Sequence, residues 1–290
     1  MLQSWAVSKP TENEMRAAVK TALDEDVGAG DATSQATVPT DVMARARMNT
    51  REKLSVAGLE LAEVAFKEVD AAVAIERLAN DGDRLDPESC ILVLNGPARS
   101  LLTAERVALN FVQRLSGVAT ATFHYVEAVK GTKAVILDTR KTTPGWRRLE
   151  KYAVTCGGGT NHRIGLFDMV MIKDNHLVAL REAKPNAISA AVQRSRVKYP
   201  RLRVEVEADN LEQVQQAVDA GADVILLDNM SCDELRSAVG IVDGRCKTEA
   251  SGGVTLETVR AIAETGVDFI SVGAITHSVR SVDIGLDFAD

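Results

Sequence analysis

The chain has 290 residues, of which 46% are hydrophobic and 26% charged, a composition typical of a globular protein with one large or two smaller domains. Its formal net charge of −7 argues against nucleic acid as a partner, so any anion site must be built locally from a few cations. No apolar run approaches the roughly 20 residues of a membrane span, and residues 1–15 lack a secretory pattern. We therefore expect a cytoplasmic protein whose four cysteines, none spaced as C-x-x-C, are mostly reduced.

The first part of the chain mixes helices and strands in irregular order. A helix is predicted over residues 11–26, because Thr11 can cap it, Glu14 follows three positions later and apolar residues recur at helical spacing. The segment 27–39 is predicted as a loop. Strands are further predicted over 44–58, 72–79 and 91–96, and helices over 59–70 and 101–115. This order indicates an α+β domain.

From about residue 134 the chain becomes a regular series of short apolar strands and helices. The strands are predicted over 134–141, 169–175, 203–209, 224–229, 247–253 and 269–274, and the last four recur about every 21–23 residues. Repeated βα units predict parallel strands with helices outside, and we expect an α/β barrel. An open doubly wound sheet is the alternative, but the absence of G-x-G-x-x-G after the first strand argues against a dinucleotide site.

Each of these strands ends in polar or glycine residues, and in either architecture the carboxyl ends of the strands, here called the rim, form the binding site. Alternation along 203–209 turns Glu205 and Glu207 inward, where a carboxylate needs a partner, and Lys141 and Lys173 are candidates. We assign Glu207 to function and leave Glu205 open between structural pairing and catalysis. The other polar residues expected at the rim are Asp138, Thr139, Arg140, Asp174, Asn175, His176, Asp228 and Asn229.

Two glycine-containing strand ends, 251–253 and 272–274, suit a phosphate, because backbone N–H groups can approach an anion there and a helix is predicted after each. The stretch "CGGGTNHR" places His162 and Arg163 in a flexible loop, which predicts a substrate clamp. His162 stays open between this role and that of a surface or capping histidine. No histidine cluster predicts a tightly held metal.

The motifs "LDTRKTTPG", "CGGGTNHRIGLFDMVMIKDNH", "VEVEAD", "LLDN", "EASGGV" and "SVGAITHS" resemble the quinolinate phosphoribosyltransferase family, as do "EDVGAGDATS" and "TAERVALNFVQRLSGVAT". The resemblance covers nearly the whole chain. It implies an N-terminal α+β sandwich domain over 1–117, then a C-terminal open α/β barrel of seven parallel strands over 118–276. A tail, 277–290, is expected to return to the first domain. A homodimer or a hexamer of dimers is also implied, with each site completed by Arg106 of the partner subunit.

The resemblance implies a reaction that joins quinolinate to phosphoribosyl pyrophosphate, with loss of pyrophosphate and carbon dioxide, giving nicotinate mononucleotide for NAD biosynthesis. The residues implied to bind quinolinate are Arg106, Arg140, Lys141, His162, Arg163 and Lys173, and Thr139 is implied to bind substrate. Those implied to bind the sugar phosphate are Ser251, Gly252, Gly253, Val272, Gly273 and Ala274. Glu207 and Asp228 would hold the ribose directly or through Mg²⁺ that enters with the pyrophosphate, and Lys141 and Lys173 complete the expected catalytic set. No tightly bound organic cofactor is implied.

Three other functions fit parts of the pattern. A related phosphoribosyltransferase for nicotinate would need fewer cations around the base, and the number of Arg and Lys residues at the rim favours the dicarboxylate. A Schiff-base aldolase would use Lys141 or Lys173 as its nucleophile, whereas the flanking arginines favour a permanently protonated lysine. A non-catalytic binding protein would not need every rim position intact.

Overall fold

The computed structural model describes residues 9–289, which form two compact units. Within these residues, one unit comprises 9–123, 143–158 and 278–289, and the other comprises 124–142 and 159–277. The predicted two-part α/β organisation is confirmed, with an antiparallel sheet in the first unit and a parallel sheet in the second. The predicted domain limits at 117 and 276 stay a prediction.

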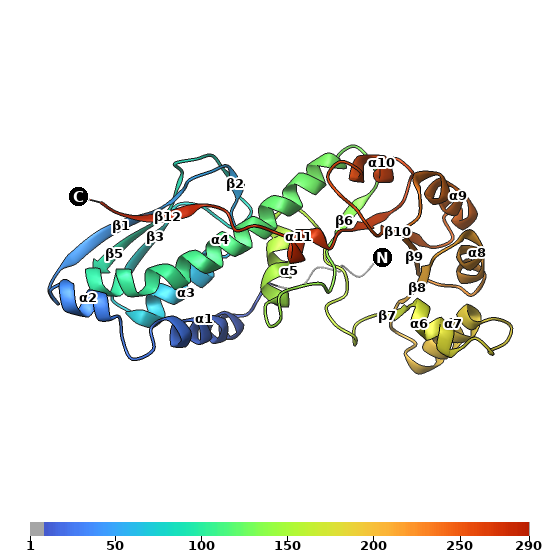
Figure 1. Cartoon of the computed structure of the whole chain (residues 1–290), viewed down its shortest axis with the longest axis horizontal. Coiled ribbons are helices and arrows are strands. Elements are labelled where there is room, and N and C mark those ends of the chain that lie inside the picture. Colours follow the sequence, from blue (N-terminus) through green and yellow to red (C-terminus); the bar gives the residue numbers. More distant parts are fainter. Residues whose placement is uncertain (1–8, 290) are drawn as a thin grey trace. The chain divides into compact units, whose positions relative to one another are not determined.

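The first unit is built on an antiparallel sheet with the strand order β12-β1-β5-β3 (Figure 1). Three of its strands, β1 (Met43–Thr50), β3 (Ala74–Arg77) and β5 (Cys90–Pro97), fall in the predicted strand segments. The fourth, β12 (Ile284–Ala289), comes from the last residues of the chain and pairs with β1. A separate short ladder joins β2 (Leu54–Ser55) to β4 (Arg84–Leu85).

The helices of this part are α1 (Glu12–Asp26), α2 (Ala32–Thr37), α3 (Leu59–Val69), α4 (Ala98–Ala128) and α5 (Arg147–Cys156). The capping box predicted for α1 is present, because Thr11 Oγ1 accepts from the Glu14 amide and Glu14 Oε2 accepts from the Thr11 amide. The loop predicted over 27–39 is wrong in its middle, where the Asp31 carboxylate caps α2.

The helix α4 also continues well beyond the predicted 101–115. Gly117 lies inside the helix, and the backbone carbonyl of Arg280 passes where a Cβ at this position would stand. Gly117 therefore serves a close approach between two segments of the first unit and does not break the helix.

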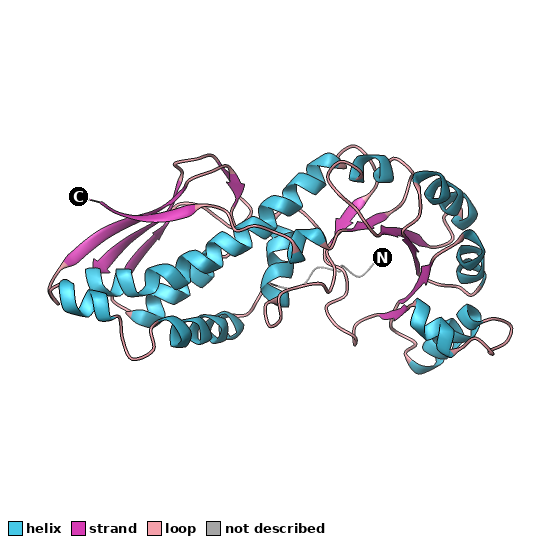
Figure 2. Cartoon of the chain, in the orientation of Figure 1, coloured by secondary structure: helices cyan, strands magenta, loops and turns pink. Residues whose placement is uncertain are grey.

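The second unit is a curved parallel sheet with the order β6-β11-β10-β9-β8-β7 (Figure 2). All six predicted strands are present, as β6 (Val135–Leu137), β7 (Val170–Ile172), β8 (Val204–Ala208), β9 (Val224–Asp228), β10 (Lys247–Ser251) and β11 (Phe269–Ser271). The seven strands implied by the resemblance are not found in the described residues. A single parallel bridge between Leu137 and Thr160 continues the order beyond β6.

Helices cover the outer side of this sheet, as Figure 1 shows for α8, α9 and α10. The bounds in this unit are α6 (Asp174–Ala179), α7 (Ala187–Lys198), α8 (Leu211–Asp219), α9 (Cys232–Val242), α10 (Val259–Ala263) and α11 (Ala274–His277). Strand β9 is buried at its first four residues, as expected for a parallel strand covered on both faces. Across residues 9–289, no helix has both the length and the apolar character needed to cross a bilayer.

Asp268 ties β10 to the start of β11 at the end of the sheet opposite the rim. Its carboxylate accepts from Lys247 Nζ at 2.8 Å, Thr248 Oγ1 at 3.0 Å and Thr248 N at 3.1 Å. Burial by itself raises the pKa of Asp268, but the hydrogen bonds from Lys247 and Thr248 outweigh burial and hold the pKa below its ordinary value.

We expect Asp268→Asn to lower the free energy of unfolding by about 2 kcal/mol at neutral pH, because it weakens a charge-assisted network around a side chain that is 15% exposed. The folded-state pKa lies below the unfolded one, so this contribution is complete above about pH 4 and is lost as the pH falls through the folded pKa. Urea unfolding at neutral pH and at about pH 3.5 measures the change. Asp233→Asn, at a 94% exposed position, is the control, and a pH-independent difference for Asp268→Asn would contradict the assignment.

Candidate active site

A cavity of about 790 Å³ opens at the carboxyl ends of the parallel strands in the second unit. This is the place that the sequence predicted, because parallel strands bring their polar ends to one edge. The predicted site residues that line the cavity are Thr139, Arg140, Lys141, His162, Arg163, Lys173, Glu207, Asp228, Ser251, Gly252, Gly253, Gly273 and Ala274.

Among the residues expected at the rim, Asp138, Asp174, Asn175 and His176 do not line the cavity, and neither do two of the residues implied to bind substrate. Val272 is buried beside Gly273, and Arg106 is exposed on α4 in the first unit. Asn229, expected at the rim, also lines the cavity. Residues that line the cavity but were not expected there from the sequence are Met171, Leu226, Glu249, Val254, Thr255, Ser271 and His277. Glu249 was within reach of sequence reasoning, because it lies two positions before Ser251 and shares its face of β10.

Four cationic side chains line the cavity, those of Arg140, Lys141, Arg163 and Lys173. Lys141 is held by its backbone, since its carbonyl accepts from Thr276 Oγ1 at 2.8 Å and its amide donates to Thr139 Oγ1 at 3.0 Å. Burial, reinforced by the charge of Arg140, lowers the pKa of Arg163. A guanidinium stays charged at neutral pH even after such a shift, so the cavity concentrates positive charge in an acidic protein.

Lys173 contacts the carboxylate of Glu207, so Lys173 is the partner that an inward carboxylate on β8 required. Asp228 ends the next strand, β9. Burial, with the nearby negative charge of Glu207, raises the pKa of Asp228. The rim therefore holds two close carboxylates beside the cations, a set of oxygen donors suited to a divalent cation or to ribose hydroxyls.

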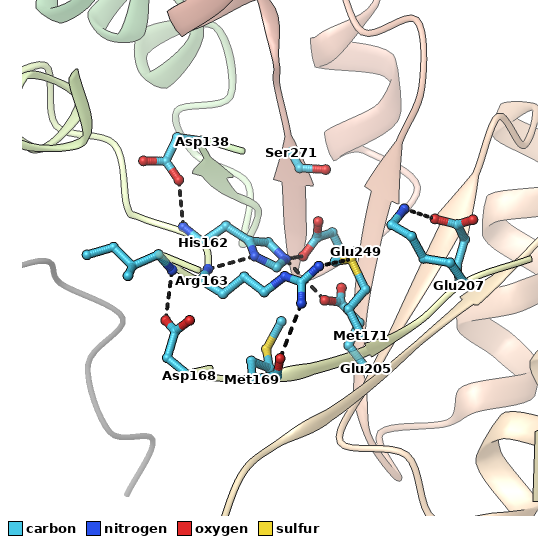
Figure 3. Close-up of polar contacts among 12 residues, drawn as sticks. Asp138, His162, Arg163, Asp168, Met169, Met171, Glu205, Glu207, Glu249 and Ser271 are labelled. Carbon is cyan, nitrogen blue, oxygen red and sulfur yellow. Dashed lines mark hydrogen bonds and ion pairs between the residues drawn. The ribbon is translucent and has the colours of Figure 1, made fainter. Parts of the chain in front are cut away.

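His162 does not lie in an exposed loop, which corrects the sequence-based interpretation. Its side chain is 5% exposed, and its Nε2 atom lies 3.1 Å from Glu205 and 3.4 Å from Glu249 (Figure 3). The partner expected for Glu205 was a lysine of the rim, and the structure places this histidine there instead. Glu205 and Glu249 are themselves fully buried.

Asp138, which directly follows β6, is also buried, and its carboxylate binds groups of the neighbouring loop. Its carboxylate accepts from the His162 amide at 2.8 Å and from Asn161 Nδ2 at 2.7 Å. Asp138 therefore fixes the backbone that carries His162 and Arg163.

Two family models account for nearly all of the chain. Residues 31–116 match the model for the quinolinate phosphoribosyl transferase N-terminal domain, and residues 118–287 match the model for its C-terminal domain. The chain belongs to the quinolinate phosphoribosyltransferase family. The resemblance drawn from the motifs is thereby confirmed.

Relatives in this family match along almost their whole length. The chain is 45% identical to the nicotinate-nucleotide pyrophosphorylase (carboxylating) of Mycobacterium leprae, covering 94% of this chain and 96% of the relative. It is 43% identical to the chloroplastic enzyme of the same name from Arabidopsis thaliana, covering 96% and 84%. The solved structure of the nicotinate-nucleotide pyrophosphorylase from Francisella tularensis superposes with a TM-score of 0.93 at 39% identity, covering 99% and 100%.

In this member of the family, Gly252 is required at the rim for two separate reasons. Its φ of +96° lies in the left-handed region, and a Cβ would overlap the side chain of Asn229. Asn229 itself has a φ of 55° and donates to Asp228 Oδ2 at 2.6 Å. A side chain at 252 would therefore disturb Asn229 and the Asp228 carboxylate that Asn229 holds.

We expect Gly252→Ala to raise the KM for phosphoribosyl pyrophosphate by roughly 10- to 100-fold. The alanine would add about 1–3 kcal/mol of backbone strain at the rim, where the substrate binds. Steady-state kinetics with each substrate varied in turn measures the effect. Gly221→Ala is the matched control, because Gly221 has a φ of +77° with open space where a Cβ would stand. Similar KM values for both variants would remove the special role of the Asn229 contact.

Proposed function

We propose that this protein is a decarboxylating quinolinate phosphoribosyltransferase, which supplies nicotinate mononucleotide for NAD biosynthesis. The observation that carries the proposal is the convergence of Arg140, Lys141, Arg163 and Lys173 with the glycine-rich strand ends in one cavity. Quinolinate carries two adjacent carboxylates and phosphoribosyl pyrophosphate carries several phosphate charges. Such a pair of substrates requires a dense set of cations within a protein of negative net charge.

Quinolinate is proposed to bind on the side of the cavity formed by Arg140 and Arg163. Guanidinium groups hold planar carboxylates with two parallel hydrogen bonds, which fixes the ring as well as its charge. Thr139 and Lys141 follow the same strand, β6, and face the same cavity. The glycines at 252, 253 and 273 would accept the sugar phosphate through backbone amides.

Magnesium is proposed to enter with the pyrophosphate and to be held by Glu207 and Asp228. The residues fit this ion, because both carboxylates are close enough for the charge of Glu207 to raise the pKa of Asp228. When bound, Mg²⁺ would neutralise charge on the pyrophosphate.

The reaction would form a bond between the pyridine nitrogen and the C1 atom of the ribose as the bond from C1 to pyrophosphate breaks. Positive charge then develops at C1, and the carboxylates of Glu207 and Asp228 are placed to stabilise it. The ribosylated ring is a pyridinium, which accepts the electron pair left when the C2 carboxylate departs as carbon dioxide. C2 then takes a proton from water in place of the departed carbon dioxide, which gives nicotinate mononucleotide. For this step the arginines supply the orientation of the ring.

A homodimer, or a hexamer built from dimers, is proposed to share its active sites between subunits through Arg106. Support comes from the family resemblance, which implies this role for Arg106, and from the exposure of Arg106 on α4. The cytoplasmic location expected from the sequence stays a prediction, and relatives from plants carry chloroplastic or mitochondrial in their names.

The deciding experiment mixes the purified protein with quinolinate, phosphoribosyl pyrophosphate and Mg²⁺ and measures nicotinate mononucleotide, pyrophosphate and carbon dioxide. Nicotinate replaces quinolinate in a parallel reaction, and chelation of Mg²⁺ should abolish product. Turnover of nicotinate without quinolinate turnover would favour the related phosphoribosyltransferase. Borohydride trapping of Lys141 or Lys173 by a carbonyl substrate would favour an aldolase, although Lys173 is held in an ion pair with Glu207.

A further inference from the structure

His162, Glu205 and Glu249 form a buried cluster beneath the arginine side of the cavity (Figure 3). Both carboxylates are fully buried, and none of their four oxygens has a hydrogen bond among the described residues. The contacts of these carboxylates with His162 Nε2 are close enough for ion pairs but lack hydrogen-bond alignment. Two buried carboxylates are costly unless a positive charge or a shared proton offsets them, so the cluster requires a physical reason.

The other nitrogen of the His162 ring identifies its tautomer. Nδ1 accepts a hydrogen bond from the backbone amide of Arg163 at 2.7 Å, so Nδ1 carries no proton in this arrangement and Nε2 does. Burial lowers the pKa of His162, but the charges of Glu249 and Glu205 outweigh it and raise the pKa to about 10. A second proton on the ring would, however, point Nδ1–H at the Arg163 amide. Protonation therefore requires that amide to turn away, and the ring as placed is neutral.

The same contact argues against a metal ion in this cluster, although the three ligand atoms lie within 4.8 Å of one another. A histidine that ligates through Nε2 carries its remaining proton on Nδ1 and donates it to a neighbouring acceptor. Here the neighbour of Nδ1 is a donor, the Arg163 amide.

Arg163 is held chiefly through its backbone. The preceding residue is anchored by Asp138, and the following amides of Ile164 and Gly165 donate to Asp168 at 2.7 and 2.9 Å. Among the described residues, the guanidinium makes longer hydrogen bonds, to the Met169 carbonyl at 3.3 Å and to Met171 Sδ at 3.4 Å. The orientation of this cation thus depends on the amide that His162 holds.

We propose that His162, braced by Glu205 and Glu249, is a positioning residue that sets Arg163 for the substrate dicarboxylate and does not itself bind quinolinate. The proposal rests on the proposed function, and it replaces the role of quinolinate ligand that the sequence suggested for His162. Each ring nitrogen faces a protein group, with Nε2 directed to the buried carboxylates and Nδ1 to Arg163. The imidazole therefore links the position of Arg163 at the rim to the buried carboxylates on β8 and β10.

A double-mutant cycle tests whether His162 acts through Arg163. We expect His162→Ala to raise the KM for quinolinate about 10-fold and Arg163→Ala about 100-fold, with the double variant within about twofold of Arg163→Ala. The KM for phosphoribosyl pyrophosphate should stay within about twofold of the wild type in His162→Ala. A double variant near the product of the two single effects would show that His162 binds quinolinate directly and would overturn the proposal.

Two conservative variants separate positioning from a general loss of packing. In His162→Asn the side-chain oxygen can replace Nδ1 as acceptor for the Arg163 amide, whereas His162→Gln can keep only the contact toward the carboxylates. Asparagine should therefore restore most of the wild-type KM for quinolinate, and glutamine should resemble alanine. The reverse order would overturn the proposal. If His162→Ala does not fold, His162→Gln takes its place in the cycle.

Two further measurements distinguish this proposal from a metal site at His162 and from a failure of the proposed function. Elemental analysis of the purified wild type that finds one equivalent of a transition metal, absent from His162→Gln, would overturn the neutral-histidine assignment. A wild type that does not turn over quinolinate would defeat the proposed function, whereas an active wild type with additive variants would defeat only the positioning role.

Discussion

Arg140→Ala is expected to lower kcat/KM for quinolinate by at least about 30-fold while leaving the protein folded, because truncating one charged partner in a desolvated pair typically costs about 2–5 kcal/mol. Arg140 lies three residues after Leu137, the buried end of β6, and lines the cavity with Arg163. Losing it removes two-point recognition of a carboxylate and part of the charge that offsets the dianion. Steady-state kinetics with quinolinate varied at saturating phosphoribosyl pyrophosphate measures the change.

The matched control is Arg181→Ala, because the side chain of Arg181 is 75% exposed and lies outside the cavity. This variant should retain kcat/KM within about twofold, since exposed ion pairs contribute little. Melting temperatures of both variants should stay near the wild-type value. Near-normal quinolinate turnover by Arg140→Ala would remove the central support for the proposed function.

Mixing two inactive variants is expected to restore activity if subunits share their sites. Arg106→Ala removes the residue proposed to act in the partner, and Lys141→Ala removes a residue of the cavity itself. Each variant alone should be nearly inactive. After dissociation and random reassembly, half of the dimers contain one chain of each kind, and each has one intact site, so activity should recover to about a quarter of the wild-type value.

The control for this mixture pairs two variants of the same cavity, Lys141→Ala and Arg140→Ala. In a dimer of these two chains, each cavity still contains one damaged residue, and no activity should return. Full activity of Arg106→Ala on its own, or recovery in the control mixture, would contradict the shared site. The KM for quinolinate in the rescued mixture should match the wild type, because the surviving sites are complete.

The sequence predicted most of the rim because alternation and strand ends are local features. Glu207 and Lys173 were placed as an inward carboxylate and a cation from the neighbouring strand, and they form an ion pair. All six parallel strands were found because each is an apolar run followed by polar residues. The same reasoning failed at 27–39, where a single side chain, Asp31, caps a helix within an otherwise loop-like stretch.

The buried histidine cluster could not be predicted because its partners come together only in three dimensions. His162 follows three glycines and reads as part of a flexible loop, whereas β8 and β10 bring Glu205 and Glu249 to it from distant parts of the chain. Arg106 gave no local signal either, since an exposed arginine on a helix is ordinary. Its proposed role depends on a second chain, which no pattern within one chain encodes.

The pairing of β12 with β1 links the order of synthesis to the order of folding. Asn49 donates to Asp287, which lies 238 residues further along the chain. While a ribosome is still making the second unit, the edge of β1 that will receive β12 has unpaired amides and carbonyls, a surface prone to pairing with other chains. The first part of the protein to emerge is thus among the last to complete its sheet, and the nascent chain must keep that edge protected until the final residues arrive.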